Sequence, residues 1–79
     1  MARTVQDLWD EMNEYVESGK TYHFECTHEG EYQPFEGKPL KMGEDAMLVR
    51  ITKGNDEVNE GSTIWIEMED FCFMEIIEV

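Results

Sequence analysis

The chain has 79 residues and a mass of 9.3 kDa, which leaves room for one small domain and little space for a buried multi-residue active site. Its 19 Asp and Glu residues against 6 Lys and Arg residues give a formal net charge of −13, which excludes proteins that grip nucleic acid directly. Because 41% of the residues are hydrophobic and 11% are aromatic, we expect a folded single domain over residues 1–79 and not a disordered acidic tail.

The first expected element is an amphipathic helix over about residues 4–18. Thr4 is followed three residues later by Asp7, which is a capping-box-like pair, and apolar residues then recur at spacings of three and four. Gly19 is expected to end the helix, because glycine tolerates the left-handed conformation that closes one. The apolar positions are Val5, Leu8, Trp9, Met12 and Val16.

Four strands are expected after the helix, over about residues 20–27, 46–53, 63–68 and 74–79. In the first of them Tyr22, Phe24 and Cys26 alternate with polar residues, so one face is expected to be buried. The second is apolar on both alternations, as in a central strand, and a polar hairpin loop connects it to the third. Residues 28–39 contain two Gly and two Pro, which favours a long connection with at most a short strand inside it.

A helix followed by four or five short antiparallel strands indicates the α+β class. With a one-turn interruption before the last strand, this order resembles the small SH3-like or Sm-like barrel, a resemblance of architecture alone. The alternative is an open sheet of three or four strands with the helix packed across one face. Most large apolar residues are expected in the core, with Trp65 facing outward if Ile64 and Ile66 point inward.

The charges are distributed unevenly along the chain. No base lies between Thr4 and Gly19, and none lies between Gly54 and Val79, whereas four of the six bases lie in the segment 38–53. A solvated helix face normally mixes charges of both signs, because Glu and Lys four residues apart stabilise it. The helix also carries Glu14 and Glu17 near its C-terminus, where the macrodipole disfavours negative charge. This pattern favours a functional acidic face over a surface that is acidic for solubility alone.

We therefore expect a small non-enzymatic inhibitor that binds the basic site of a nucleic-acid-binding protein as a mimic of DNA or RNA. In size and charge the chain resembles small acidic phage-encoded inhibitors of restriction or CRISPR systems. The alternative is a generic interaction or structural module, such as a homodimer through an open sheet edge. The expected partner-binding residues form two acidic rows with two aromatic anchors: Asp7, Asp10, Glu11, Glu14, Glu17, Tyr15, Trp65, Glu67, Glu69 and Asp70.

Other chemistry is weaker in the sequence. His23, Cys26, His28 and Cys72 could suggest zinc, but a flat strand places His23 on the face opposite Cys26, so no metal is expected. A reduced, buried cysteine pair is favoured over a disulfide. No catalytic motif, phosphate-binding loop or cofactor signature is present. The longest apolar runs are four residues, far below the ~20 that span a bilayer, so we expect a soluble cytoplasmic protein without membrane or direct nucleic-acid contacts.

Overall fold

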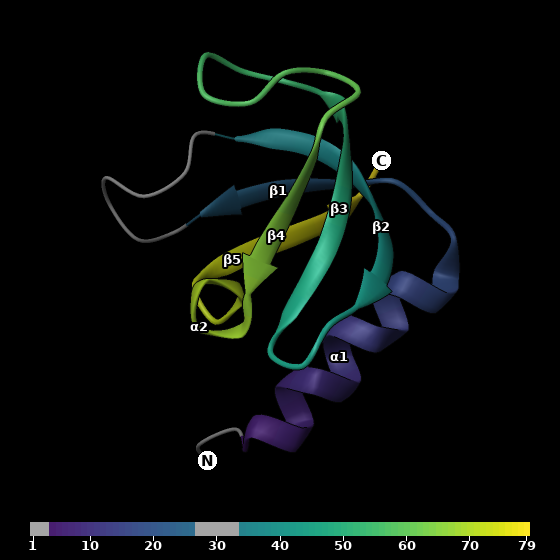
Figure 1. Cartoon of the computed structure of the whole chain (residues 1–79), viewed down its shortest axis with the longest axis vertical. Coiled ribbons are helices and arrows are strands. Elements are labelled where there is room, and N and C mark those ends of the chain that lie inside the picture. Colours follow the sequence, from purple (N-terminus) through teal and green to yellow (C-terminus); the bar gives the residue numbers. More distant parts are fainter. Residues whose placement is uncertain (1–3, 27–33) are drawn as a thin grey trace.

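An N-terminal helix packs against a five-stranded antiparallel sheet in the computed structural model, which describes residues 4–26 and 34–79 (Figure 1). The strand order is β4-β3-β2-β1-β5, so β4 and β5 are the two edges of an open sheet. The expected α+β class is confirmed. The elements are α1 (Val5–Ser18), β1 (Tyr22–Cys26), β2 (Phe35–Met42), β3 (Ala46–Lys53), β4 (Thr63–Glu67), α2 (Met68–Phe71) and β5 (Met74–Glu78).

Helix α1 begins at the capping box that the sequence predicts. The backbone N–H of Asp7 donates to Thr4 Oγ1 at 3.1 Å, and the backbone N–H of Thr4 donates to Asp7 Oδ2 at 3.0 Å. Each bond satisfies an amide that would lack a partner in the first helical turn. The helix ends at Gly19, whose φ of 68° is the left-handed conformation expected there.

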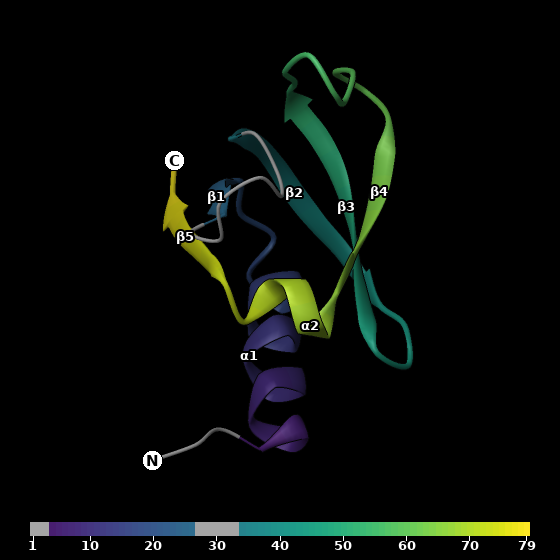
Figure 2. The same ribbon diagram turned by 90° about the vertical axis from the view of Figure 1, so that its left-hand side faces the viewer.

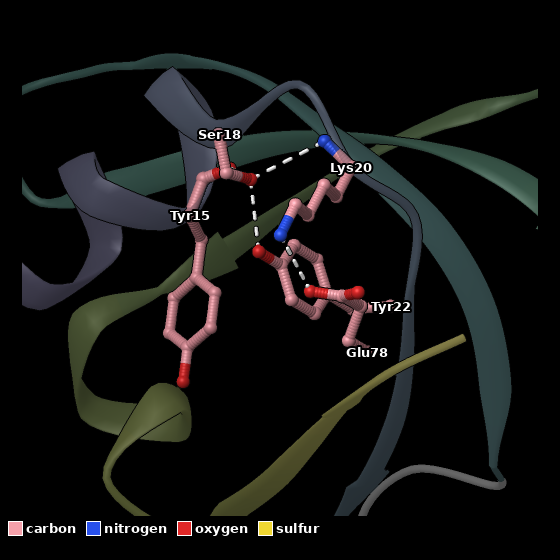
Figure 3. Close-up of polar contacts among 5 residues, drawn as sticks. All are labelled: Tyr15, Ser18, Lys20, Tyr22 and Glu78. Atoms are coloured by element: carbon pink, nitrogen blue, oxygen red, sulfur yellow. Dashed lines mark hydrogen bonds and ion pairs between the residues drawn. The ribbon is translucent and has the colours of Figure 1, made fainter.

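Ser18 connects the end of α1 to β1 (Figure 3). Its hydroxyl donates to the backbone carbonyl of Tyr15 at 2.7 Å and accepts from the hydroxyl of Tyr22 at 2.8 Å. It also accepts from the backbone N–H of Lys20 at 3.2 Å. The Lys20 Nζ donates to Glu78 Oε1 at 2.9 Å, and this hydrogen bond and the carboxylate charge raise the pKa of Lys20. The start of β1 is thereby joined to both α1 and β5.

Strand β2 is the main correction to the expected elements. Residues 35–39 of the segment predicted as a connection form the first part of an eight-residue strand between β1 and β3, which continues beyond Pro39 to Met42. The pairing shifts register between Pro39 and Lys41, so Leu40 lies in a bulge. At Gly37 an added Cβ would lie 2.5 Å from Val49 Cγ1, so a larger residue does not fit this crossing. The part of the predicted connection before residue 34 lies outside the described residues.

The bounds of the other elements agree closely with the expected ones. Strand β3 occupies the expected residues, and β1, β4 and β5 are each shorter than expected by one to three residues. The interruption before the last strand is the short helix α2, which connects the edge strands β4 and β5 and lies beside α1 (Figure 2).

The core lies between α1 and the concave side of the sheet. Helix α1 contributes Leu8 and Met12, and the strands contribute side chains that include Phe24, Val49 and Ile66. Phe24 stacks on Phe35 with ring centroids 5.1 Å apart. Trp9 is half-buried against this core, whereas Met12 and Phe71 are buried as expected.

Two large apolar residues and one cysteine near the C-terminus lie outside the core, where residues of these types were generally expected. Phe73, which lies between α2 and β5, is 45% exposed. Ile77 is 58% exposed, because the edge strand β5 turns Met74 and Ile76 toward the core. Cys72 is a free thiol, as expected, so the alternative disulfide is wrong, but it is exposed after α2 and not buried. Within residues 4–26 and 34–79, no helix is long and apolar enough to cross a membrane.

Candidate partner-binding site

The polar face of α1 carries three exposed carboxylates. Asp10, Glu14 and Glu17 lie on the side opposite the buried Leu8 and Met12. Asp10 Oδ1 accepts a hydrogen bond from Gln6 Nε2 at 2.9 Å, and Glu17 Oε1 accepts one from Asn13 Nδ2 at 3.2 Å. Both donors are neutral amides, so these contacts order the carboxylates and leave their charges in place. We call Asp10, Glu14 and Glu17 the acidic helix face.

Ion pairs in the described part of the chain do not neutralise this face. Lys20 binds Glu78, and His23 lies 3.9 Å from Glu25 and 4.0 Å from Glu36. Within residues 4–26 and 34–79, no ion pair includes a residue of the acidic helix face. The charge of this face is therefore balanced by solvent and counterions. A basic partner would displace these counterions on binding.

Asp7 belongs to the same helix but has a structural task. Its carboxylate accepts the Thr4 backbone N–H in the capping box, and it lies at the helix N-terminus where the macrodipole favours negative charge. Any partner contact that Asp7 makes has to coexist with this cap. The acidic helix face lies one to three turns further along α1 and takes no part in the cap.

The structure places the second predicted acidic row next to α1. Glu67, Glu69 and Asp70 lie at the end of β4 and on α2, with Asp70 half-buried and the other two exposed. The aromatic rings of Tyr15 and Phe71 contact each other with centroids 6.0 Å apart, so α2 packs against α1 (Figure 2). Glu11 lies one turn before Tyr15 on the same side of α1 and thus faces this junction. Glu11 of the first row and Glu69 and Asp70 of the second therefore lie near the junction of α1 and α2, whereas Asp10, Glu14 and Glu17 lie on the other side of α1.

Tyr15 is half-buried and holds three elements together. Its ring contacts the ring of Tyr22 edge to face with centroids 4.9 Å apart, in addition to its contact with Phe71. Most of this aromatic surface is therefore used within the fold. The exposed part of Tyr15 is what remains for a partner.

Trp65 is exposed, as expected from the inward position of Ile66, but it lies away from the acidic helix face. It is 49% exposed and points to the convex side of the sheet, whereas α1 packs on the concave side. The Lys41 Nζ lies 5.9 Å from the centroid of the Trp65 ring, a cation–π contact. The structure thus places the two predicted anchors in different surroundings: Tyr15 with acids, and Trp65 with bases.

The basic surroundings of Trp65 were not anticipated. Lys38 and Arg50 are cross-strand partners on β2 and β3, and both are exposed on the convex side. Lys41 and Trp65 are the two cross-strand partners of Leu48, so all of them share this side of the sheet. We call Lys38, Lys41, Arg50 and Trp65 the basic sheet face. The cluster of bases in the segment 38–53 was the available signal, but the face emerges only once β2 is known to be a strand.

The positions considered for metals do not converge. No group of three or more His, Cys, Asp or Glu side chains in the described ranges, 4–26 and 34–79, is arranged to hold a metal ion, and His28 lies outside those ranges. In the loop between β3 and β4, the Asn55 side chain accepts the backbone N–H groups of Glu57 and Val58 at 2.7 and 3.0 Å. This turn presents Asp56 and Glu57 to solvent.

A shallow pocket of about 220 Å³ lies between β1, β2 and the end of β3. Its lining includes His23, Glu36 and Lys53, so it carries groups of both charge signs. No protein-family model, curated protein or solved structure matches the chain.

Proposed function

We propose that this protein is a stoichiometric, non-enzymatic inhibitor that occupies the basic site of a nucleic-acid-binding protein. The observation that carries the proposal is the acidic helix face, whose three carboxylates are exposed on one side of α1 and form no ion pair within residues 4–26 and 34–79. Glu11 on α1 and the acids of α2 add negative charge near the junction of the two helices.

The physical argument is one of spacing and counterions. Carboxylates three or four residues apart on a helix lie roughly 5–6 Å from each other, which is comparable with successive phosphates of a nucleic-acid strand. A basic groove that binds DNA or RNA gains free energy from the release of counterions, and an acidic helix offers it the same gain. A helix shaped for stability alone would carry bases in its last turn, and α1 has none there.

We further infer that the sheet belongs to the small SH3-like or Sm-like barrel type. The continuous order β4-β3-β2-β1-β5 and the short helix α2 between the two edge strands support this inference. The protein acts in the cytoplasm in this proposal, as phage-type inhibitors of restriction or CRISPR systems do, and it uses no cofactor and no metal.

A second candidate function is a general interaction module whose acidic surface serves solubility. The observation that favours it is the presence of two edge strands, β4 and β5, on which another chain or a second copy can pair. An interface of this kind depends on backbone hydrogen bonds and apolar contacts, and its affinity therefore changes little with salt.

The test is affinity capture from a lysate at low salt with elution by a rising salt gradient, followed by mass spectrometry. The proposal predicts one enriched nucleic-acid-binding protein that salt releases and added DNA or RNA displaces. With purified target, the affinity can be measured directly at about 50 and 200 mM salt. Complexes held by contacts of this type lose orders of magnitude in affinity between these two concentrations.

Two variants with equal charge change separate a local effect from a global one. Changing Asp10, Glu14 and Glu17 to Lys should abolish capture, whereas changing Asp56, Glu57 and Glu60 in the loop between β3 and β4 to Lys should leave it largely intact. Equal loss in both variants would show that only net charge matters. Capture that survives the helix variant, or a partner that resists salt, would overturn the proposal.

A further inference from the structure

The outer edge of β4 is open in the sheet that the structure describes, because β3 is its only neighbour there. The hydrogen bonds at both ends of the β3–β4 pair fix which backbone groups face this edge. The Ile51 N–H donates to the Ser62 carbonyl at 2.8 Å, and the Met68 N–H donates to the Asp45 carbonyl at 2.8 Å. Hydrogen-bonded pairs alternate with non-bonded pairs in an antiparallel ladder, so Thr63, Trp65 and Glu67 turn their N–H and C=O groups outward.

The side chains beside this edge are basic over most of its length. Arg50 is the cross-strand partner of Thr63, and Lys38 is the partner of Arg50 on the next strand. Lys41 lies two strands from the edge, yet its Nζ approaches within 5.9 Å of the Trp65 ring, so its side chain crosses β3 toward the edge. The exposed acid of β4 on this side, Glu67, is at the α2 end of the strand.

We propose that the β4 edge binds an extended acidic peptide of a partner protein as an added strand. Main-chain hydrogen bonds to Thr63, Trp65 and Glu67 provide the pairing, and Trp65 provides apolar contact. The acidic side chains of the peptide lie beside Thr63 and Trp65, where Arg50 is on the neighbouring strand β3 and the side chain of Lys41 reaches the Trp65 ring. The end near Glu67 accepts neutral side chains.

A short acidic peptide fits this charge pattern better than a nucleic acid does. The basic sheet face is a local patch on a protein with a net charge of −13. Charges more than about 8 Å apart are largely screened at physiological salt, so a short peptide interacts mainly with the patch. A polynucleotide continues its negative charge past the patch toward Glu67 or Glu36, where it is repelled.

This binding site is separate from the acidic helix face. Trp65 and its basic neighbours lie on the convex side of the sheet, whereas α1 packs on the concave side. A partner with a basic groove and an acidic segment could use both surfaces, and the peptide site stands without that partner.

The test is titration of the ¹⁵N-labelled full chain, followed by NMR, with a capped hexapeptide in which Glu and Thr alternate. The expected shifts fall on the backbone amides of Thr63, Trp65 and Glu67 and on the indole N–H of Trp65. A Gln-for-Glu peptide should bind at least tenfold more weakly. A Glu peptide that is N-methylated at every residue should not bind, because neither of its edges can donate hydrogen bonds to β4.

Protein variants complete the test. The double variant K41E/R50E should weaken binding of the Glu peptide at least tenfold, whereas D10K/E14K/E17K should retain it, which separates this site from the proposed inhibitor function. Equal binding of the Gln or N-methylated peptide would overturn the proposal. So would tighter binding of the oligonucleotide dT6 at the same residues, or concentration-dependent shifts along β4 without peptide, which would indicate a nucleic acid or a second copy.

Discussion

At the scale of single residues, Ser18 makes the connection on which the end of α1 depends. One hydroxyl serves as donor to the Tyr15 carbonyl and as acceptor for the Tyr22 hydroxyl and the Lys20 amide. Tyr22 is buried except for a small part, so its hydroxyl has few other partners. A buried polar group that loses its partner costs more free energy than an exposed one.

We therefore predict that Ser18→Ala lowers the free energy of unfolding by about 1–2 kcal/mol. Urea denaturation monitored by circular dichroism gives this value. Tyr22→Phe is the control, because it removes the phenol that Ser18 accepts. In the Tyr22→Phe background the effect of Ser18→Ala should become smaller by about 0.5–1.5 kcal/mol. Additive effects of the two changes would show that this hydrogen bond contributes nothing to stability.

At the scale of elements, α1 carries acids at both ends, and the helix macrodipole treats the two ends differently. Asp7 lies in the first turn, where negative charge is favourable, and Glu17 lies in the last turn, where no base offsets it. Neutral amides test the charges alone, because Asn and Gln keep a side-chain oxygen that can accept the hydrogen bonds seen at both positions.

We predict that Asp7→Asn destabilises the protein and that Glu17→Gln stabilises it, each by about 0.3–1 kcal/mol. Chemical denaturation at low ionic strength gives both values. The two changes alter net charge equally, so each is the control for the other. If both variants gain stability to the same extent, net charge outweighs the position along the helix.

The elements also show what could be predicted from the sequence. Helix α1 and strand β3 have strong periodic patterns, so the predicted and observed bounds agree. Strand β2 was missed because Gly37 and Pro39 are poor strand residues. The structure accommodates Pro39 beside a bulge and requires Gly37 for close approach to Val49, and neither reason is visible in one sequence.

Residues of the candidate site could be placed correctly from the sequence where the helix or strand that contains them was itself predicted correctly. The acidic helix face follows from helical periodicity, so its exposure could be predicted before the structure was known. The outward position of Trp65 followed from the alternation of β4. Its basic neighbours could not be assigned, because Lys38 and Lys41 belong to β2 and their face depends on the bulge between them.

At the scale of the whole molecule, a net charge of −13 on 79 residues opposes the compact state. The radius of gyration is 11.7 Å, so many exposed carboxylates lie close enough to repel one another at low salt. Added salt screens this repulsion more in the folded protein than in the expanded unfolded chain.

We predict that the melting temperature rises when NaCl increases from 10 to 500 mM. For a domain of this size, each kcal/mol of added stability raises the melting temperature by about 4–8 °C. Scanning calorimetry measures the rise. The variant with Lys at positions 10, 14 and 17 has a net charge of −7, because each change adds two charges to −13, and it should show a smaller rise. A melting temperature that falls or stays constant would mean that attractive ion pairs dominate the electrostatics.

The placement of the acidic helix face and the basic sheet face on different sides of the fold gives the molecule a permanent electric dipole. In the field of a positively charged surface, the protein rotates during its approach so that α1 leads and Trp65 points away. Immobilisation on a cationic support therefore orients the molecules and leaves the β4 edge accessible.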